Sequence, residues 1–300
     1  MVVYWLFRLT IRITRPLPLW LGYRVAASVA EVCYHFFRPQ RRALNENMAR
    51  VLGSSDKRRV DAVARRAFRN FGKFVIDFIH FPAMTREEVR GRLAFSQWVE
   101  LDEAAASGRG ILIVTMHFGL FDLGAAALAA HDYRTNIIVE NYGHPKMDNL
   151  IHSSREKLGV KVIPANKVGI QVFRAIKRGE ILALLIDVAP PGQEITVEFL
   201  GAPAVVSAAP ARLALRTGAW VVPAMVLRGP QDDSIIRPIL DTRSVRYEPT
   251  GDEERDVREL TQQIMRAFEP IVREHPEQWF IFRRMWPELE QRSAFPAFAP

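Results

Sequence analysis

One histidine and one aspartate in the sequence have types and a spacing that suit proton transfer. His117 follows the short apolar run Ile111–Thr115, and Asp122 lies five residues further along the chain. A neutral imidazole can remove the proton from a hydroxyl as that hydroxyl attacks a thioester. A carboxylate on the other ring nitrogen fixes the tautomer of the imidazole and stabilises its charged form. We therefore predict that His117 is a general base and that Asp122 orients it.

This chemistry requires no protein nucleophile, metal or other cofactor. The sequence has no Gly-x-Ser-x-Gly elbow, and its single cysteine, Cys33, lies in an apolar segment near the N-terminus. It also has no His-x3-His pair and no acidic cluster with metal-ligand spacing. We expect direct transfer without an acyl-enzyme. The oxyanion should be stabilised by backbone N–H groups near Gly119 or by Arg155.

Runs typical of buried strands alternate with helix-like stretches from about residue 108 onward. We predict strands at 111–115, 135–139, 160–164, 181–186, 219–225 and 234–239. We predict helices at 119–130, 145–158, 168–178, 207–217 and 251–273. This alternation indicates an α/β fold with a mostly parallel central sheet flanked by helices. Ligands lie beyond the carboxyl ends of strands in such sheets, and His117 and Asp187 both fall at such ends.

The positive charge is concentrated near the N-terminus. Of the formal net charge of +8, residues 1–60 contribute all, with eleven Arg or Lys and three Asp or Glu. Nucleic acid and acidic lipid headgroups are both possible partners of such a segment on charge alone. The same segment is rich in large apolar and aromatic residues, which favours a lipid surface over nucleic acid.

Two apolar stretches make up this N-terminal segment. In the first, Arg8, Arg12 and Arg15 share one helical face, and Trp5 lies among the apolar residues on the others. The second, 17–37, has roughly the length of a membrane span but carries two charged residues. We expect an interfacial helical segment. A single span and the packing helices of a soluble protein remain the alternatives.

The domain boundaries follow from these patterns. We predict a membrane-associated segment at 1–40, a catalytic α/β domain at 41–292 and a flexible tail at 293–300. Residues 41–81 should be helical, with a break near 53–56.

Several blocks occur in the order found in one family. His117-x4-Asp122 matches the first motif of the glycerolipid and lysophospholipid acyltransferase superfamily. The further blocks are Arg42–Asn47, Glu140–Asp148 with Arg155, Asp187 with Val197–Gly201, Ala211–Pro223, and His275–Trp279 with Arg283, Arg284 and Trp286. Together they resemble the late acyltransferases of bacterial lipid A biosynthesis, the lauroyl and myristoyl branch. They are also similar to the mycobacterial phosphatidylinositol mannoside acyltransferase.

The resemblance implies a membrane enzyme with two lipid substrates. It implies transfer of a fatty acyl chain from acyl-carrier protein or acyl-coenzyme A to a hydroxyl of a glycolipid such as a lipid A precursor. A phosphatidylinositol mannoside is the alternative acceptor, and a catalytically silent lipid-binding protein is an alternative of another class. The implied location is the cytoplasmic face of the bacterial inner membrane, at an anionic surface.

The resemblance also assigns roles to further side chains. Arg155 should bind a phosphate or the pantetheine arm of the donor, and Glu140 should pair with Arg155 or orient His117. Phe118 and Phe121 should line the groove for the acyl chain. Asp187 is expected in the site. The chain has Asp187-Val-Ala-Pro-Pro-Gly192 where many members carry other polar residues, so Glu194 or Glu198 could take its place.

Overall fold

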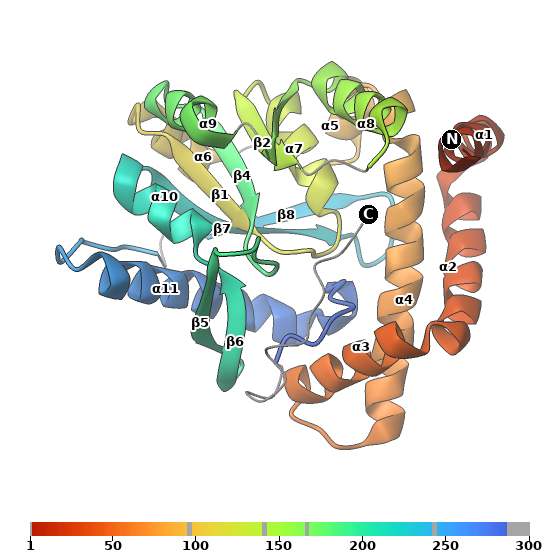
Figure 1. Cartoon of the computed structure of the whole chain (residues 1–300). Coiled ribbons are helices and arrows are strands. Elements are labelled where there is room, and N and C mark those ends of the chain that lie inside the picture. Colours follow the sequence, from red (N-terminus) through yellow and green to blue (C-terminus); the bar gives the residue numbers. More distant parts are fainter. Residues whose placement is uncertain (1, 95–97, 140–142, 166–167, 242–244, 287–300) are drawn as a thin grey trace.

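A six-stranded sheet forms the centre of the chain, in a computed structural model that describes residues 2–94, 98–139, 143–165, 168–241 and 245–286. The strand order is β3-β2-β4-β1-β7-β8, and only β8 runs antiparallel to its neighbour. The strands are β1 (Ile111–Thr115), β2 (Thr135–Val139), β3 (Val160–Pro164), β4 (Ile181–Leu185), β7 (Trp220–Arg228) and β8 (Ile236–Leu240). The predicted α/β fold with a mostly parallel sheet is confirmed (Figure 1).

One strand pair was missed by the sequence interpretation. Strands β5 (Glu194–Phe199) and β6 (Ala202–Ser207) form an antiparallel hairpin outside the main sheet. The turn between them contains Leu200 and Gly201, both with positive φ, at 53° and 77°. A conformation of this kind suits a tight hairpin turn.

Alternate side chains of the central strands enter two separate cores. Ile111 and Ile113 of β1 pack against α7 (Phe121–Ala130), near α5 (Arg86–Gly91) and α6 (Val99–Ala106). Leu112 and Val114 point to the opposite face. Helix α8 (Pro145–Lys157) follows β2. The opposite face is covered by α9 (Val168–Lys177), α10 (Ala209–Thr217) and α11 (Glu253–Glu274).

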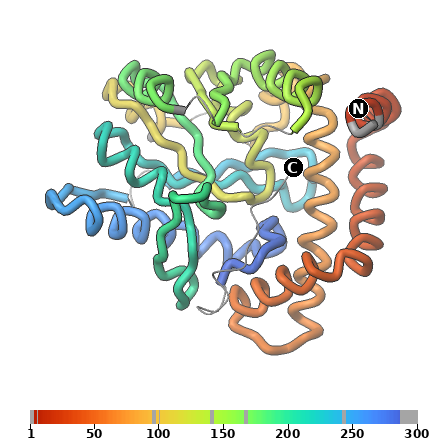
Figure 2. Tube along the Cα trace, in the orientation of Figure 1, coloured from red at the N-terminus to blue at the C-terminus, as the bar shows by residue number. Residues whose placement is uncertain are grey.

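The N-terminal quarter is a set of helices against one end of this α/β unit. It comprises α1 (Val2–Thr14), α2 (Leu19–Phe36), α3 (Arg38–Val51) and α4 (Lys57–His80). Figure 2 shows α2 running alongside α4. They cross closely at Gly72, where an added Cβ would lie 2.6 Å from the carbonyl oxygen of Ala26. Two short 3₁₀ helices, η1 (Phe81–Ala83) and η3 (Pro276–Gln278), also pack against α4.

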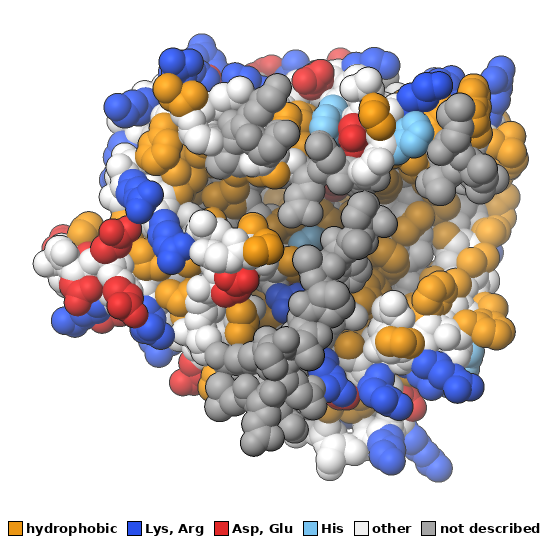
Figure 3. All heavy atoms as spheres, in the orientation of Figure 1, with side chains coloured by type: hydrophobic (Ala, Val, Ile, Leu, Met, Phe, Trp, Pro, Cys, Tyr) orange, Lys and Arg blue, Asp and Glu red, His pale blue; other side chains and the backbone are white. Residues whose placement is uncertain are grey.

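The side of α1 and α2 that faces away from the body is apolar. On α2, four large side chains at helical spacing are 56% exposed or more: Val25, Val29, Val32 and Phe36. On α1, Trp5, Leu9 and Ile13 are each more than half exposed. Hydrophobic side chains gather along this side in Figure 3. We call these seven residues the N-terminal apolar stripe. No helix within the described ranges combines the length and apolar character needed to cross a membrane.

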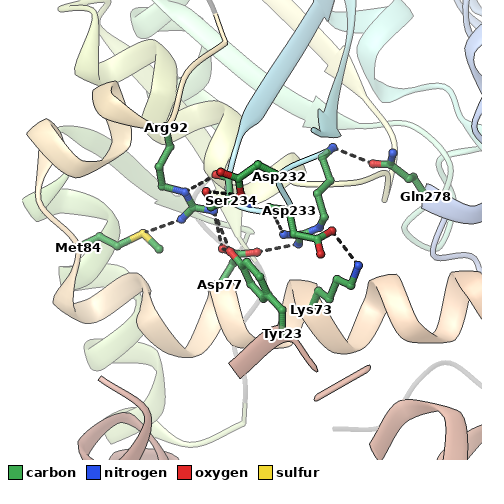
Figure 4. A network of polar contacts seen from close by, with 10 residues as sticks. Tyr23, Lys73, Asp77, Met84, Arg92, Asp232, Asp233, Ser234 and Gln278 are labelled. Atoms are coloured by element: carbon green, nitrogen blue, oxygen red, sulfur yellow. Dashed lines mark hydrogen bonds and ion pairs between the residues drawn. The ribbon is translucent and has the colours of Figure 1, made fainter. Parts of the chain in front are cut away.

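A buried charge cluster joins the N-terminal helices to the sheet (Figure 4). The Asp77 carboxylate on α4 is 2.7 Å from each of Arg92, Arg228 and the Tyr23 hydroxyl on α2. Burial raises the pKa of Tyr23, so this hydroxyl remains a donor. Arg228 ends β7, and its backbone N–H donates to the Gln278 side chain at 2.8 Å. The cluster therefore fixes α2 and α4 relative to the strand and the C-terminal segment that border the site. The predicted tail at 293–300 lies outside the described residues.

Candidate active site

The side chain of His117 is held by Asp187, which lies 70 residues away in the sequence. The Nδ1 atom of His117 is 2.9 Å from one carboxylate oxygen of Asp187. The backbone N–H of His117 donates to the other oxygen at 3.0 Å. Both oxygens of the Asp187 carboxylate therefore contact His117, which fixes the position and the ring orientation of the imidazole.

The sheet topology brings these two residues together. Strands β1 and β4 are parallel neighbours in register, with Thr115 opposite Leu185. Each strand continues into a short segment, and His117 and Asp187 are the second residues after the two strand ends. The expected common edge is thus confirmed. The partner of His117 is Asp187 rather than Asp122.

Asp187 is fully buried and is itself fixed by the C-terminal segment. Its carboxylate accepts a hydrogen bond from the indole Nε1 of Trp279 at 3.2 Å. The guanidinium of Arg283 donates to its backbone carbonyl. A buried carboxylate needs such partners because desolvation disfavours its charge. Two residues of the C-terminal block, Trp279 and Arg283, therefore support the acid behind His117.

Opposing effects set the charge states of the pair. Burial alone would lower the pKa of His117, but the charge of Asp187 and its hydrogen bond outweigh burial and raise it. Burial alone would raise the pKa of Asp187, but His117 and Trp279 lower it. An ionised carboxylate only accepts, so the neutral imidazole must carry its proton on Nδ1. The Nε2 atom is then left as the basic nitrogen.

Asp122 has a different partner from the one predicted. Both of its carboxylate oxygens are 3.0 Å from one guanidinium nitrogen of Arg155 on α8. The two side chains are only 12% and 7% exposed. Asp122 lies in the first turn of α7, and this turn directs its carboxylate toward α8. The prediction that Asp122 holds His117 was therefore wrong, although the charge of Asp122 contributes to the raised pKa of His117.

The loop between β1 and α7 is pinned by backbone hydrogen bonds. Gly119 N–H donates to the carbonyl of Gln278, and Leu120 N–H donates to that of Val226, both at 2.7 Å. Gly119 has a φ of +56°, and an added Cβ would lie 2.1 Å from the Val226 oxygen. Only glycine fits there. The N–H groups of Gly119 and Leu120 already have acceptors, so these two are not available to an oxyanion.

A large cavity of about 1160 Å³ opens in front of His117. His117, Phe121, Asp122 and Arg155 all line it, and the His117 side chain is 31% exposed. One wall consists of aromatic residues of α4: Phe71, Phe74 and Phe78. Arg212 and Arg216 of α10 also line it. The cavity thus combines an apolar wall with cationic groups, as an acyl donor with phosphates would require.

Phe121 takes the expected place and Phe118 does not. The Phe121 ring lies edge-on to His117, with ring centroids 5.2 Å apart, and stacks on Phe74 at 4.9 Å. Phe118 is fully buried in the core that also contains Leu112 and Val114, where it forms an antiparallel bridge with Trp279. The prediction that Phe118 lines the groove was therefore wrong.

The remaining acidic candidates fall outside this constellation. Glu194 and Glu198 are exposed residues of β5 in the separate hairpin, and Asp187 occupies the site instead. Glu140 lies outside the described residues. The sequence reasoning missed the α4 wall and Arg212 with Arg216. The spacing of Phe71, Phe74 and Phe78 indicated only a helical face, and nothing local placed that face opposite His117.

The fold and the site define a class of enzyme. A carboxylate-held histidine near an arginine–aspartate pair, in a large cavity at the carboxyl edge of a parallel sheet, suits acyl transfer to a hydroxyl. The sequence model of the bacterial lipid A biosynthesis acyltransferases matches residues 1–288, and the chain belongs to this family.

Curated relatives support the same class. A phosphatidylinositol mannoside acyltransferase of Mycobacterium tuberculosis is 23% identical over 250 residues, covering 81% of this chain and 76% of that protein. Its counterpart in Mycolicibacterium smegmatis is 23% identical over 248 residues, covering 81% and 78%. The chain is therefore an acyltransferase, and its family and relatives support a glycolipid acceptor.

The Asp187 contact predicts a specific change in the titration of His117. In Asp187→Asn, the imidazolium loses its counter-charge while burial remains, so the pKa of His117 should fall. In Asp122→Asn the fall should be smaller, because Asp122 acts only through charge. Histidine titration by NMR measures both values. A His117 pKa that moves only in Asp122→Asn would contradict the pairing seen here.

Proposed function

We propose that the protein transfers a fatty acyl chain from an acyl thioester to a hydroxyl of a membrane glycolipid, with His117 as the general base. The observation that carries this proposal is the Asp187-held imidazole facing a cavity of about 1160 Å³. The cavity is large enough for parts of two substrates, because pockets for a single drug-sized ligand measure roughly 300–1,000 Å³. The donor is acyl-carrier protein or acyl-coenzyme A.

The proposed reaction follows from the tautomer of His117. Nε2 takes the proton of the acceptor hydroxyl as its oxygen attacks the thioester carbonyl. Asp187 stabilises the imidazolium that forms. The tetrahedral intermediate then collapses, the carbon–sulfur bond breaks, and the imidazolium returns the proton to the leaving thiolate. The products are an ester and a free thiol, and no acyl-enzyme forms.

Arg155 supplies positive charge in this scheme. Its guanidinium lines the cavity and is fixed by Asp122 at 3.0 Å. A fixed guanidinium suits the phosphate of a pantetheine arm or the oxyanion of the intermediate. The backbone donors at Gly119 and Leu120 are already bonded, which favours Arg155 as the stabiliser. Asp122 is accordingly a positioning residue for Arg155.

The acceptor is a lipid A precursor in our proposal, on the strength of the family match. A phosphatidylinositol mannoside is the second candidate, because the curated relatives carry that name. Both acceptors present sugar hydroxyls above lipid chains, so the same base and the same cavity serve either one.

Replacing His117 should separate catalysis from substrate binding. In His117→Ala, transfer should fall about 10²–10⁴-fold, because general base catalysis contributes that much. Mass spectrometry of the products from purified protein, an acyl thioester and either acceptor measures this and identifies the acylated lipid. His144→Ala is the matched control, since His144 caps α8, is not among the described residues that line the cavity, and should leave transfer unchanged. Undiminished transfer by His117→Ala would exclude His117 as the base.

We further propose that the N-terminal apolar stripe rests on the membrane, at the cytoplasmic face of the inner membrane. Arg8, Arg12 and Arg15 are exposed on and beside α1 and carry charge toward anionic headgroups. Phe7 of α1 contacts Phe78 of α4 at 6.0 Å between ring centroids, and Phe78 lines the cavity. A surface-bound α1 would thus bring the cavity close to the lipid acceptor.

Charges placed on this stripe should weaken membrane binding. The double variant Val25→Glu and Val29→Glu should bind anionic vesicles at least about tenfold more weakly, because two exposed apolar contacts are lost. Vesicle sedimentation measures this. Val99→Glu is the matched control, because Val99 is equally exposed, at 58%, but lies on α6. Equal loss in the control, or none in the double variant, would contradict the proposal.

A further inference from the structure

Two parts of the wall of the large cavity differ in chemistry. Toward the N-terminal helices, the wall is the aromatic face of α4, with Phe71, Phe74 and Phe78. Another part of the wall belongs to α10, which contributes Arg212 and Arg216. Figure 1 shows α10 on the other side of the α/β unit from α1 and α2. The arginine side of the cavity therefore lies away from the N-terminal apolar stripe.

One face of α10 forms this side of the cavity. The lining residues Ala209, Arg212, Leu213 and Arg216 lie three or four positions apart, so they share one face of the helix. Because Ala209 begins the helix, the positive end of the helix dipole also lies at the cavity. Two guanidinium groups and the helix dipole therefore favour an anion on this side.

The guanidinium of Arg212 is held by a neutral side chain. Its Nη1 atom donates to Oε1 of Gln193 at 2.8 Å, and the residue is half-buried. Within the described parts of the chain, no carboxylate forms an ion pair with it. Arg216 is paired with Glu253 at 3.0 Å, but these side chains are 61% and 68% exposed, so water screens the pair. Arg212 is therefore a fixed cation that is suited to an anionic ligand.

The charge of Arg155, in contrast, is already compensated. Among the described residues that line the cavity, Asp122 is the only acid, and it is 3.0 Å from Arg155. No such acid lines the cavity on the side of Arg212. The two arginines therefore suit different groups of the substrates, and a full negative charge is better matched by Arg212.

The loop between β4 and β5 fixes Gln193. The backbone N–H of Gln193 donates to the carbonyl of Pro190 at 3.0 Å, and its carbonyl accepts the N–H of Ala208 at 2.7 Å. The same loop follows Asp187, whose carboxylate orients the imidazole. The amide that supports Arg212 is therefore attached to the orienting carboxylate by a short, hydrogen-bonded segment.

We propose that Arg212, assisted by Arg216, binds the phosphate of the donor's pantetheine arm, so that the donor enters along α10. This rests on the proposed acyl transfer. The arm carries its phosphate at one end and the thioester at the other, so the phosphate must bind at a distance from His117. Acyl-carrier protein and acyl-coenzyme A both contain this phosphate and both come from water. A site away from the N-terminal apolar stripe therefore suits the donor better than a lipid acceptor.

The test compares two donors that differ only in this phosphate. Wild-type kcat/KM should be about 10–100-fold higher with acyl phosphopantetheine than with acyl pantetheine, because hydrogen bonds to charged groups contribute that much. In Arg212→Ala this ratio should fall toward one. Arg216→Ala should lower it less, because Arg216 is more exposed. Arg174→Ala is the matched control, since Arg174 is an exposed residue of α9 outside the described cavity lining, and should keep the wild-type ratio.

The full substrates identify the source of the phosphate. In Arg212→Ala, kcat/KM should fall with acyl-coenzyme A and with acyl-carrier protein, while KM for the glycolipid should stay at the wild-type value. An unchanged donor ratio would overturn the proposal. So would a loss confined to one carrier, or a loss that depends on a phosphate of the glycolipid instead.

A binding measurement separates this proposal from the function on which it rests. If wild-type protein transferred no acyl chain, the proposed function would fail, and calorimetry with phosphopantetheine and pantetheine would still test the phosphate site. Tighter binding of phosphopantetheine by wild type, with the difference lost in Arg212→Ala, supports the site. Equal affinities of wild type for the two compounds overturn it.

Discussion

The contact between Asp187 and His117 is the constraint on which the rest of the site depends. A buried carboxylate is stable only with charge and hydrogen-bond partners, and Asp187 has them from His117 and Trp279. Trp279 is in turn fixed by the bridge to Phe118 and by its place in the core. The described part of the C-terminal segment, up to Trp286, therefore supports the site from behind, because none of its residues is among those that line the cavity.

The His-x4-Asp spacing has a different physical meaning from the one suggested by the sequence. His117 precedes the loop turn at Gly119, whereas Asp122 is already in the first turn of α7. The five-residue separation thus directs the two side chains to different partners, Asp187 and Arg155. One short motif places an imidazole and, through Asp122, the guanidinium of Arg155 along the same cavity. This division explains why a carboxylate from another strand must orient the imidazole.

Much of the fold could be predicted from the sequence, because it depends on local patterns. The six strands of the main sheet were found by their apolar runs, and the helices between them by their period. The β5–β6 hairpin was missed because its pattern was taken only as a family motif. The error at Phe118 had another cause: which core a residue after a strand enters depends on Trp279, over 150 positions away.

The sequence predicted which edge of the sheet carries the site, but not which side chains pair there. Strand ends located His117 and Asp187 at the same edge, but their pairing requires β1 and β4 to be neighbours, and strand order is not a local property. Asp122, five residues from His117, was a sufficient local candidate for the carboxylate that orients the imidazole, so the more distant Asp187 was not chosen for that role. The same holds for the α4 wall, which reaches His117 only through the packing of the N-terminal helices.

The central claim is that Asp187 raises the basicity of His117, which then acts as the base in acyl transfer. The pH dependence of kcat/KM in wild type and in Asp187→Asn tests it most directly. Transfer requires neutral His117, so the rate should rise with pH through a pKa above the ordinary value of about 6.5. In Asp187→Asn this rise should move to lower pH, with a lower plateau. A rise at the same pH in both proteins would contradict the account.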